Sequence, residues 1–212
     1  MKTIKSISYN QQEIINDIML LHMNGEPFEI DTTFSKGIFY KNGIVPMPGR
    51  KFDVYPLNGV EQFVLPLPFE NNSVRSIMFD PPFGIAKGKS IATKKAGQNI
   101  IINRFSSFES PKDLMHCYCT HLKEYYRILK KGGILVFKCQ ATVSSGNNLF
   151  IPEFLMMKAF KIGFYPLDCF HLLAKNRLIS GKIKKQRHAR KYSSVFWVFK
   201  KIKPKFDYNL YL

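Results

Sequence analysis

The sequence has few acids, few cysteines and no long apolar run. Its 212 residues include 15 Asp plus Glu against 32 Lys plus Arg, and the formal net charge is +17. A cationic excess of this size indicates a polyanionic partner, most often a nucleic acid and less often an anionic membrane face. Because no stretch of about 18 apolar residues occurs, the sequence predicts no transmembrane helix.

The cysteines do not form the pattern of a disulfide framework. Cys117, Cys119, Cys139 and Cys169 are irregularly spaced, and three of them lie in apolar segments typical of helices and strands. We therefore expect reduced thiols in a cytoplasmic protein. The first residues are basic but lack an apolar core and a small-residue cleavage site, so no secretory signal is expected.

Short apolar runs alternate with amphipathic stretches along the chain. Predicted strands cover residues 28–31, 51–55, 60–65, 74–80, 134–139, 164–173 and 195–200, and predicted helices cover 10–24, 112–131 and 151–161. This alternation predicts an α/β fold, with a parallel sheet that is covered by helices on both faces. We expect a single domain over residues 1–212, since neither repeats nor low-complexity tracts divide it.

Two basic stretches interrupt the alternation, residues 84–110 and 175–193. The first has no acid before Glu109, and the second has none. Long irregular segments are often functional, and Lys and Arg bind phosphates, so we expect nucleic-acid contact there; a solvated charged face is the alternative. The candidate nucleic-acid-binding residues are Lys87, Lys89, Lys94, Lys95, Arg104, Lys185, Arg187, His188, Arg190 and Lys191.

The segment Asp80-Pro81-Pro82-Phe83 directly follows an apolar predicted strand. Its two prolines have a fixed φ and no N–H, so the turn is stiff. Asp80 adds an anionic acceptor at the carboxyl end of a strand, where α/β sheets bind ligands, and Phe83 adds an aromatic face. This combination suits a planar ring with an exocyclic amine, because accepted hydrogen bonds free the lone pair of the amine. A proline-rich turn without function is the alternative.

The tetrapeptide resembles the motif Asp/Asn/Ser-Pro-Pro-Tyr/Phe/Trp of the amino-methyltransferases at all four positions. These enzymes transfer a methyl group from S-adenosyl-L-methionine to an exocyclic nitrogen of adenine or cytosine, and an acid or amide in the first position is typical of adenine enzymes. Residues 185–192 and 195–199 resemble the end of small phage- and prophage-type DNA adenine methyltransferases. The resemblance covers residues 28–201, and it implies a Rossmann-like class I fold with a seven-stranded, mostly parallel sheet.

The resemblance also implies where cofactor and substrate bind. The first cofactor loop of the family usually reads Asp-Pro-Phe-x-Gly-x-Gly, and residues 29–37 stand in its place with Gly37 as the only glycine. Asp53 ends the next predicted strand and suits an acceptor for ribose hydroxyls, although a surface acid is the alternative. The implied cofactor-binding residues are Asp31, Thr32, Thr33, Phe34, Gly37, Asp53, Leu65 and Pro66, and the implied catalytic residues are Asp80, Pro81, Pro82 and Phe83.

The implied activity is site-specific methylation of DNA at the N6 of a flipped adenine. No separate target-recognition domain is expected, so the two basic stretches would bind the DNA. One alternative is an RNA enzyme that acts on adenine N6 or guanine N2. Another is a nucleic-acid-binding protein with an inactive methyltransferase fold, which the glycine-poor loop favours. No metal is expected, because Cys117 and His121 have helical spacing and are better explained as a helix face.

Overall fold

The computed structural model describes residues 3–85, 107–176, 186–204 and 206–211. Six of the basic candidates lie outside the described residues: Lys87, Lys89, Lys94, Lys95, Arg104 and Lys185. Within the described part of the chain, no helix is long and apolar enough to cross a membrane.

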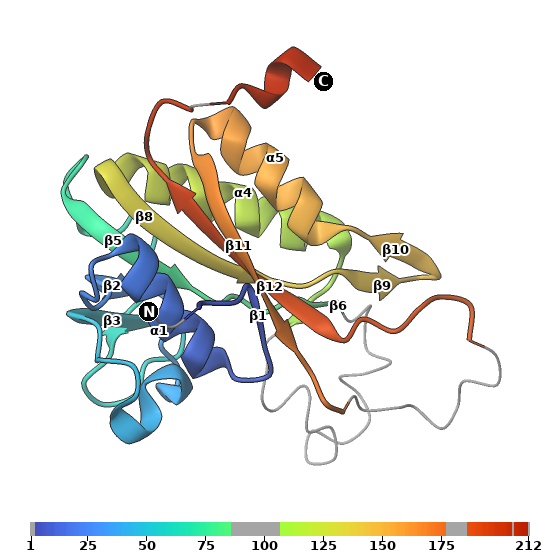
Figure 1. Cartoon of the computed structure of the whole chain (residues 1–212), viewed down its shortest axis with the longest axis horizontal. Coiled ribbons are helices and arrows are strands. Elements are labelled where there is room, and N and C mark those ends of the chain that lie inside the picture. The colour runs from blue at the N-terminus through green and yellow to red at the C-terminus, as the bar shows by residue number, and fades with distance from the viewer. Residues whose placement is uncertain (1–2, 86–106, 177–185, 205, 212) are drawn as a thin grey trace.

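A central sheet of eight strands organises the protein, in the order β1-β11-β12-β8-β5-β2-β3-β4 (Figure 1). The strands are β1 (Ile7–Ser8), β2 (Ile30–Asp31), β3 (Arg50–Asp53), β4 (Glu61–Gln62), β5 (Val74–Phe79), β8 (Leu129–Cys139), β11 (Tyr165–Leu173) and β12 (Ser193–Lys200). All neighbours pair in parallel except β12, which is antiparallel to both β8 and β11. The expected mostly parallel sheet is confirmed, and β1 adds an eighth strand to the seven expected.

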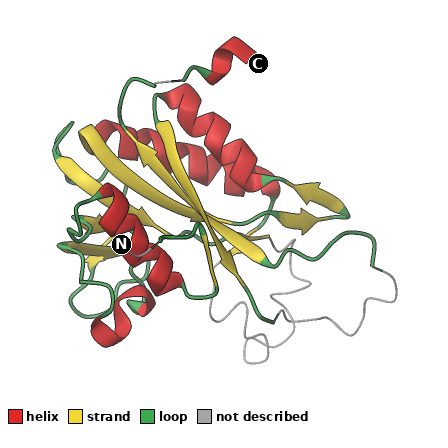
Figure 2. Cartoon of the chain, viewed as in Figure 1, coloured by secondary structure: helices red, strands yellow, loops and turns green. Residues whose placement is uncertain are grey.

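Helices cover both faces of the sheet, as expected (Figure 2). The helices are α1 (Gln11–His22), α4 (Pro111–Ile128) and α5 (Ile151–Ile162), with 3₁₀ turns η1 (Ile38–Gly43) and η2 (Tyr208–Tyr211). The period of two along β8 explains the two cores: Leu135 and Phe137 pack against the side of α4 and α5, whereas Ile134 and Val136 pack on the side of α1 and η1.

Two short strand pairs extend from the carboxyl ends of the central strands. Strands β9 (Thr142–Ser144) and β10 (Asn147–Leu149) form a hairpin after β8. Strands β6 (Gly84–Ile85) and β7 (Ser107–Phe108) pair on either side of residues 86–106. The sequence pattern predicted neither pair, because both are too short to give an alternation of apolar and polar residues.

The helix predicted for residues 112–131 ends earlier than expected. Strand β8 begins at Leu129, and the ammonium of Lys201 binds the carbonyls of Tyr126 and Leu129 at the end of α4. Gly132 and Gly133 therefore do not close a helix but lie in β8, where the register with β5 shifts. A Cβ on Gly133 would lie 2.9 Å from the Lys130 carbonyl oxygen, so the close approach of two backbone segments requires glycine there.

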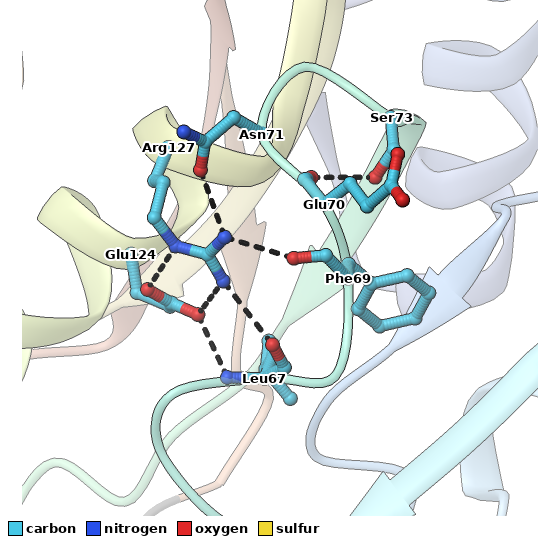
Figure 3. A network of polar contacts seen from close by, with 7 residues as sticks. All are labelled: Leu67, Phe69, Glu70, Asn71, Ser73, Glu124 and Arg127. Carbon is cyan, nitrogen blue, oxygen red and sulfur yellow. Dashed lines mark hydrogen bonds and ion pairs between the residues drawn. The ribbon is translucent and has the colours of Figure 1, made fainter.

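Arg127, near the end of α4, fastens the segment that leads into β5 (Figure 3). Its guanidinium donates to the carbonyls of Leu67 and Phe69 and to the side chain of Asn71. Glu124 binds the same guanidinium and accepts a hydrogen bond from the Leu67 N–H at 2.7 Å. These bonds join a loop without regular structure, which precedes β5, to α4.

Candidate functional site

Three aspartates lie at one edge of the sheet. Asp31 ends β2, Asp53 ends β3, and Asp80 directly follows β5. These strands are neighbours in the order β5-β2-β3 and run in parallel, so their carboxyl ends share an edge. This is the edge at which parallel α/β sheets bind their ligands.

Asp31 is a buried carboxyl group with donors on both oxygens. The Thr33 N–H donates to Oδ1 at 2.8 Å, and the Tyr40 hydroxyl donates to Oδ2 at 2.7 Å. Burial raises the pKa of Asp31 to about 7, the two hydrogen bonds oppose that rise, and the charge of Asp80 adds to it. Asp31 thus titrates in the neutral range and holds the start of the loop after β2.

The loop after β2 has the backbone shape that two glycines would allow, although it contains only one. Ser35 stands at the place of the first glycine of the family loop and has a φ of 49°, and Gly37 has a φ of 61°. Asp53 holds this shape from β3, because its Oδ2 accepts a hydrogen bond from the Ser35 N–H at 2.9 Å. Ser35 therefore adopts, although it is not glycine, a left-handed backbone that glycine adopts most readily.

Gly37 lies beneath the ring of Phe34. A Cβ at Gly37 would lie 2.6 Å from the tip of that ring. The ring is held in place by Tyr40, on which it stacks at 5.4 Å between centroids, and the Lys51 ammonium lies 5.3 Å from its centre. A larger residue than glycine would have to displace Phe34 from this stack.

The proline turn after β5 is held from both sides. The Asp80 N–H donates to the Thr33 hydroxyl at 2.7 Å, which joins the turn to the loop after β2. The Tyr118 hydroxyl of α4 donates to the Pro82 carbonyl at 2.9 Å. Among the described residues, none donates a hydrogen bond to the Pro81 carbonyl or to Asp80 Oδ1. Pro81 is buried, whereas 22% of the Asp80 side chain is exposed.

Lys138 is a member of this site that the sequence interpretation missed. Its ammonium lies 3.0 Å from Asp80 Oδ2 and 5.1 and 5.3 Å from the ring centres of Phe39 and Phe196. Burial raises the pKa of Asp80, and Lys138 opposes that rise. A lysine near the end of an otherwise apolar predicted strand was the available signal, but its partner depends on the pairing of β5 with β8.

The side chains of other predicted cofactor residues have contacts of their own. The Thr32 hydroxyl is buried and lies 2.6 Å from the Tyr125 hydroxyl of α4, so it fastens β2 to the helix. Pro66 lines an open depression of the surface beside Arg127. For Leu65, which packs against the core, and for Pro66, contact with a cofactor stays a prediction.

The described part of the second basic stretch lies at the same edge as Asp80. Residues 186–192 lead into β12, where Val195 pairs with Cys139 at the carboxyl end of β8. His188 joins this segment to the hairpin, since its Nε2 lies 2.5 Å from the Gly146 carbonyl and its Nδ1 lies 3.1 Å from the amide nitrogen of Asn148. Nucleic-acid contact by Arg187, His188, Arg190 and Lys191 stays a prediction.

Cys117 and His121 of α4 contact each other, and His121 also contacts two aromatic rings from outside the helix. The thiol lies 3.4 Å from His121 Nδ1, and the imidazole stacks between the rings of Phe63 and Phe79. Burial raises the pKa of the Cys117 thiol to about 11 and lowers the pKa of His121. The described residues contain no group of three or more His, Cys, Asp or Glu side chains that could hold a metal ion.

Comparisons with known proteins identify the fold. No family model and no curated protein matches the chain. A solved structure from Galdieria sulphuraria, assigned as a sarcosine dimethylglycine methyltransferase, is similar with a TM-score of 0.54 at 11% identity, over 91% of this chain and 86% of that one. The chain has the Rossmann-like fold of the class I S-adenosylmethionine-dependent methyltransferases.

DNA methyltransferases are among the other similar structures. The PvuII cytosine-N4-specific DNA methyltransferase matches with a TM-score of 0.46 at 19% identity, over 68% of this chain and 49% of that one. A Thermus thermophilus protein assigned as a DNA modification methylase, complexed with S-adenosyl-L-methionine, matches with a TM-score of 0.40 at 16% identity, over 66% of this chain and 49% of that one. The chain thus matches about half the length of these enzymes.

Proposed function

We propose that this protein is an S-adenosyl-L-methionine-dependent methyltransferase that modifies the exocyclic N6 of a flipped adenine in DNA. The observation that carries the proposal is the turn after β5. It carries two acceptors to which no described residue donates, Asp80 Oδ1 and the Pro81 carbonyl, at the carboxyl edge of a class I methyltransferase sheet. The acidic first residue favours adenine over cytosine.

The loop after β2 fits the cofactor. Its left-handed residues Ser35 and Gly37 turn the backbone at the sheet edge, where N–H groups can approach the methionine part of the ligand. Asp53 accepts bonds from Ser35 and Tyr55, one on each oxygen, and the second lone pair of each oxygen can accept a ribose hydroxyl. S-adenosylmethionine, when bound, supplies a methyl group on a positively charged sulfur.

The residues of the turn then activate the amine of the base. Asp80 Oδ1 and the Pro81 carbonyl accept its two N–H groups, and the nitrogen lone pair becomes available for attack. Phe83 supplies the aromatic face for the flipped base. Transfer would break the bond between the methyl carbon and the sulfur, leave S-adenosylhomocysteine and place the positive charge on the nitrogen. The excess proton of the nitrogen would pass to the Asp80 carboxylate. The stiff backbone of Pro81 and Pro82 holds both acceptors before the substrate arrives.

The proposed DNA contacts are Arg187, Arg190 and Lys191. They belong to residues 186–192, which the pairing of β12 with β8 places at the edge of the catalytic turn. The Lys191 ammonium also lies 5.7 Å from the ring centre of the exposed Phe150, which follows the hairpin. Cations and an exposed aromatic ring together suit a distorted strand next to a flipped base.

A tritiated-methyl assay on DNA, tRNA and rRNA tests the proposal, followed by modification-sensitive sequencing of DNA from expressing cells. We expect label at adenine N6 in DNA. The Asp80→Ala variant should lose transfer and bind S-adenosylmethionine within a few-fold of the unaltered chain, whereas Glu26→Ala, which removes an exposed acid elsewhere, should retain activity. Label in RNA alone would reject DNA as the substrate. Absence of calorimetric heat at millimolar cofactor would favour the inactive nucleic-acid-binding protein.

A further inference from the structure

We propose that Lys138 is a positioning residue, which holds Asp80 as an ionised acceptor with its second oxygen directed to the substrate amine. The inference rests on the proposed function and adds to it a residue outside the tetrapeptide. Lys138 acts through Asp80 and is not proposed to touch the reacting atoms.

The pairing of two strands brings Lys138 to the catalytic turn. Met78 of β5 pairs with Val136 of β8, and Phe79 pairs with Phe137. Asp80 lies two residues after Met78, and Lys138 lies two residues after Val136. Because side chains alternate along a strand, Asp80 and Lys138 project from the same face of the sheet. Their charged groups meet at 3.0 Å, with 22% of the Asp80 side chain and 10% of the Lys138 side chain exposed.

The surroundings of the ammonium make this contact specific. Ile134 and Val136, the preceding residues on this face of β8, are buried apolar side chains, and Lys138 takes the next position. Phe39 of η1 and Phe196 of β12 place their rings about the ammonium and leave Asp80 as its ion-pair partner. A cation in such a place loses hydration, and it is stable only because a carboxylate and aromatic faces replace the lost water.

The charge of Lys138 opposes the other influences on Asp80. Burial raises the pKa of the Asp80 carboxyl and Lys138 lowers it. Among the described residues, the other titratable groups that interact electrostatically with Asp80 are Asp31 of β2, Tyr40 of η1, Tyr118 of α4 and Cys139 of β8, and none of these four is cationic.

Without the ammonium, the pKa of the Asp80 carboxyl would lie higher, so the group would keep its proton to a higher pH. A protonated carboxyl group donates a hydrogen bond from one oxygen, and its other oxygen is a weaker acceptor than a carboxylate oxygen. It could no longer polarise the amine or receive the excess proton. Among the described side chains, Lys138 binds Oδ2 and none binds Oδ1, so Oδ1 is the oxygen that we assign to the substrate.

The test compares Lys138→Met and Lys138→Arg with Lys131→Met, which removes an exposed lysine from the same strand. The first measurement is the ¹³C carboxyl titration of Asp80 without cofactor, assigned through Asp80→Asn. The second is the pH dependence of kcat/KM for methyl transfer. In Lys138→Met we expect the Asp80 midpoint and the acidic limb of activity to move upward together by roughly one pH unit. Lys138→Arg and Lys131→Met should stay near the unaltered chain.

An unchanged Asp80 midpoint in a folded Lys138→Met protein would overturn the inference, and so would a uniform loss of activity without a shift of the acidic limb. If that variant does not fold, the unaltered chain still decides, because the ¹⁵Nζ resonance of Lys138 should shift with the same midpoint as the Asp80 carboxyl. Absence of methyl transfer by the unaltered chain on DNA and RNA would instead refute the proposed function. The carboxyl titration is independent of that result.

Discussion

The hydroxyl of Thr33 accepts a hydrogen bond from the backbone N–H of Asp80 at 2.7 Å. This bond joins the loop after β2, which is proposed to hold the cofactor, to the turn after β5, which is proposed to hold the base. The same hydroxyl lies 3.4 Å from Asp31 Oδ1, and Tyr40 binds the other oxygen of that carboxyl group. The two loops therefore form one polar unit, and a change in one is expected to alter the other.

Replacement of Thr33 by valine tests this link. The variant keeps the branched shape but leaves the Asp80 N–H without its acceptor, so we expect the free energy of unfolding to fall by about 1–3 kcal/mol and methyl transfer to decrease. Thr33→Ser retains the hydroxyl and should behave like the unaltered chain. Urea denaturation and the tritium assay measure both effects; equal stability and activity of the valine variant would show that the bond is dispensable.

Ser35 permits a test of the left-handed loop. Its side chain is exposed, so substitutions act mainly through the backbone. We expect the free energy of unfolding of Ser35→Gly to lie within about 1 kcal/mol of that of the unaltered chain, and we expect its affinity for the cofactor to be unchanged. A β-branched residue tolerates positive φ poorly, so Ser35→Val should be less stable by about 1–2 kcal/mol and bind S-adenosylmethionine more weakly. Similar calorimetric affinities for the glycine and valine variants would contradict this role.

The raised pKa of Asp31 predicts a pH dependence of stability. The folded-state pKa is about 7, above the ordinary value of about 3.9, so the folded state binds the proton more tightly. Stability from this group is greatest at low pH and falls as the pH rises from about 4 to 7. Tyr40→Phe removes a donor that favours the charged form of Asp31, so the pKa of Asp31 should rise. The loss of stability with increasing pH should then continue to a higher pH.

Urea denaturation between pH 4 and pH 9 measures this effect. Asp31→Asn cannot ionise and is the control, in which the contribution of Asp31 to the pH dependence should disappear. The interpretation fails if the unaltered chain and the asparagine variant lose stability in parallel over this range.

The basic segment predicts a salt-dependent binding of DNA. Replacement of Arg187, Arg190 and Lys191 by glutamine should weaken binding and reduce the slope of log K against log salt by up to about 3, since each phosphate contact contributes about 0.9. A matched control replaces the exposed residues Lys123, Lys130 and Lys131 by glutamine, which removes the same amount of charge from α4 and the start of β8. Equal slopes for the two triple variants would assign the effect to net charge alone.

Much of the fold could be predicted from local patterns in the sequence. The alternation of apolar runs and amphipathic helices depends on periods of 2 and 3.6 residues, which the chain displays directly. The starts of α1 and α4 were equally visible, because Asn10 accepts from the Gln12 N–H and Pro111 occupies the first position of α4. The Asp-Pro-Pro-Phe turn after β5 is local as well, since stiff prolines after an apolar strand need no distant contact.

The tertiary structure alone decided which side chains meet. Gly132 and Gly133 suggested the end of a helix, yet the approach of Arg75 from β5 and Lys201 from beyond β12 places them in a strand. Lys138 reaches Asp80 only because β8 pairs with β5 in one register, and a shift of one residue would turn it to the opposite face. Turn stiffness and periodicity belong to neighbouring residues, whereas the charge and orientation of Asp80 depend on strands that are far apart in the chain.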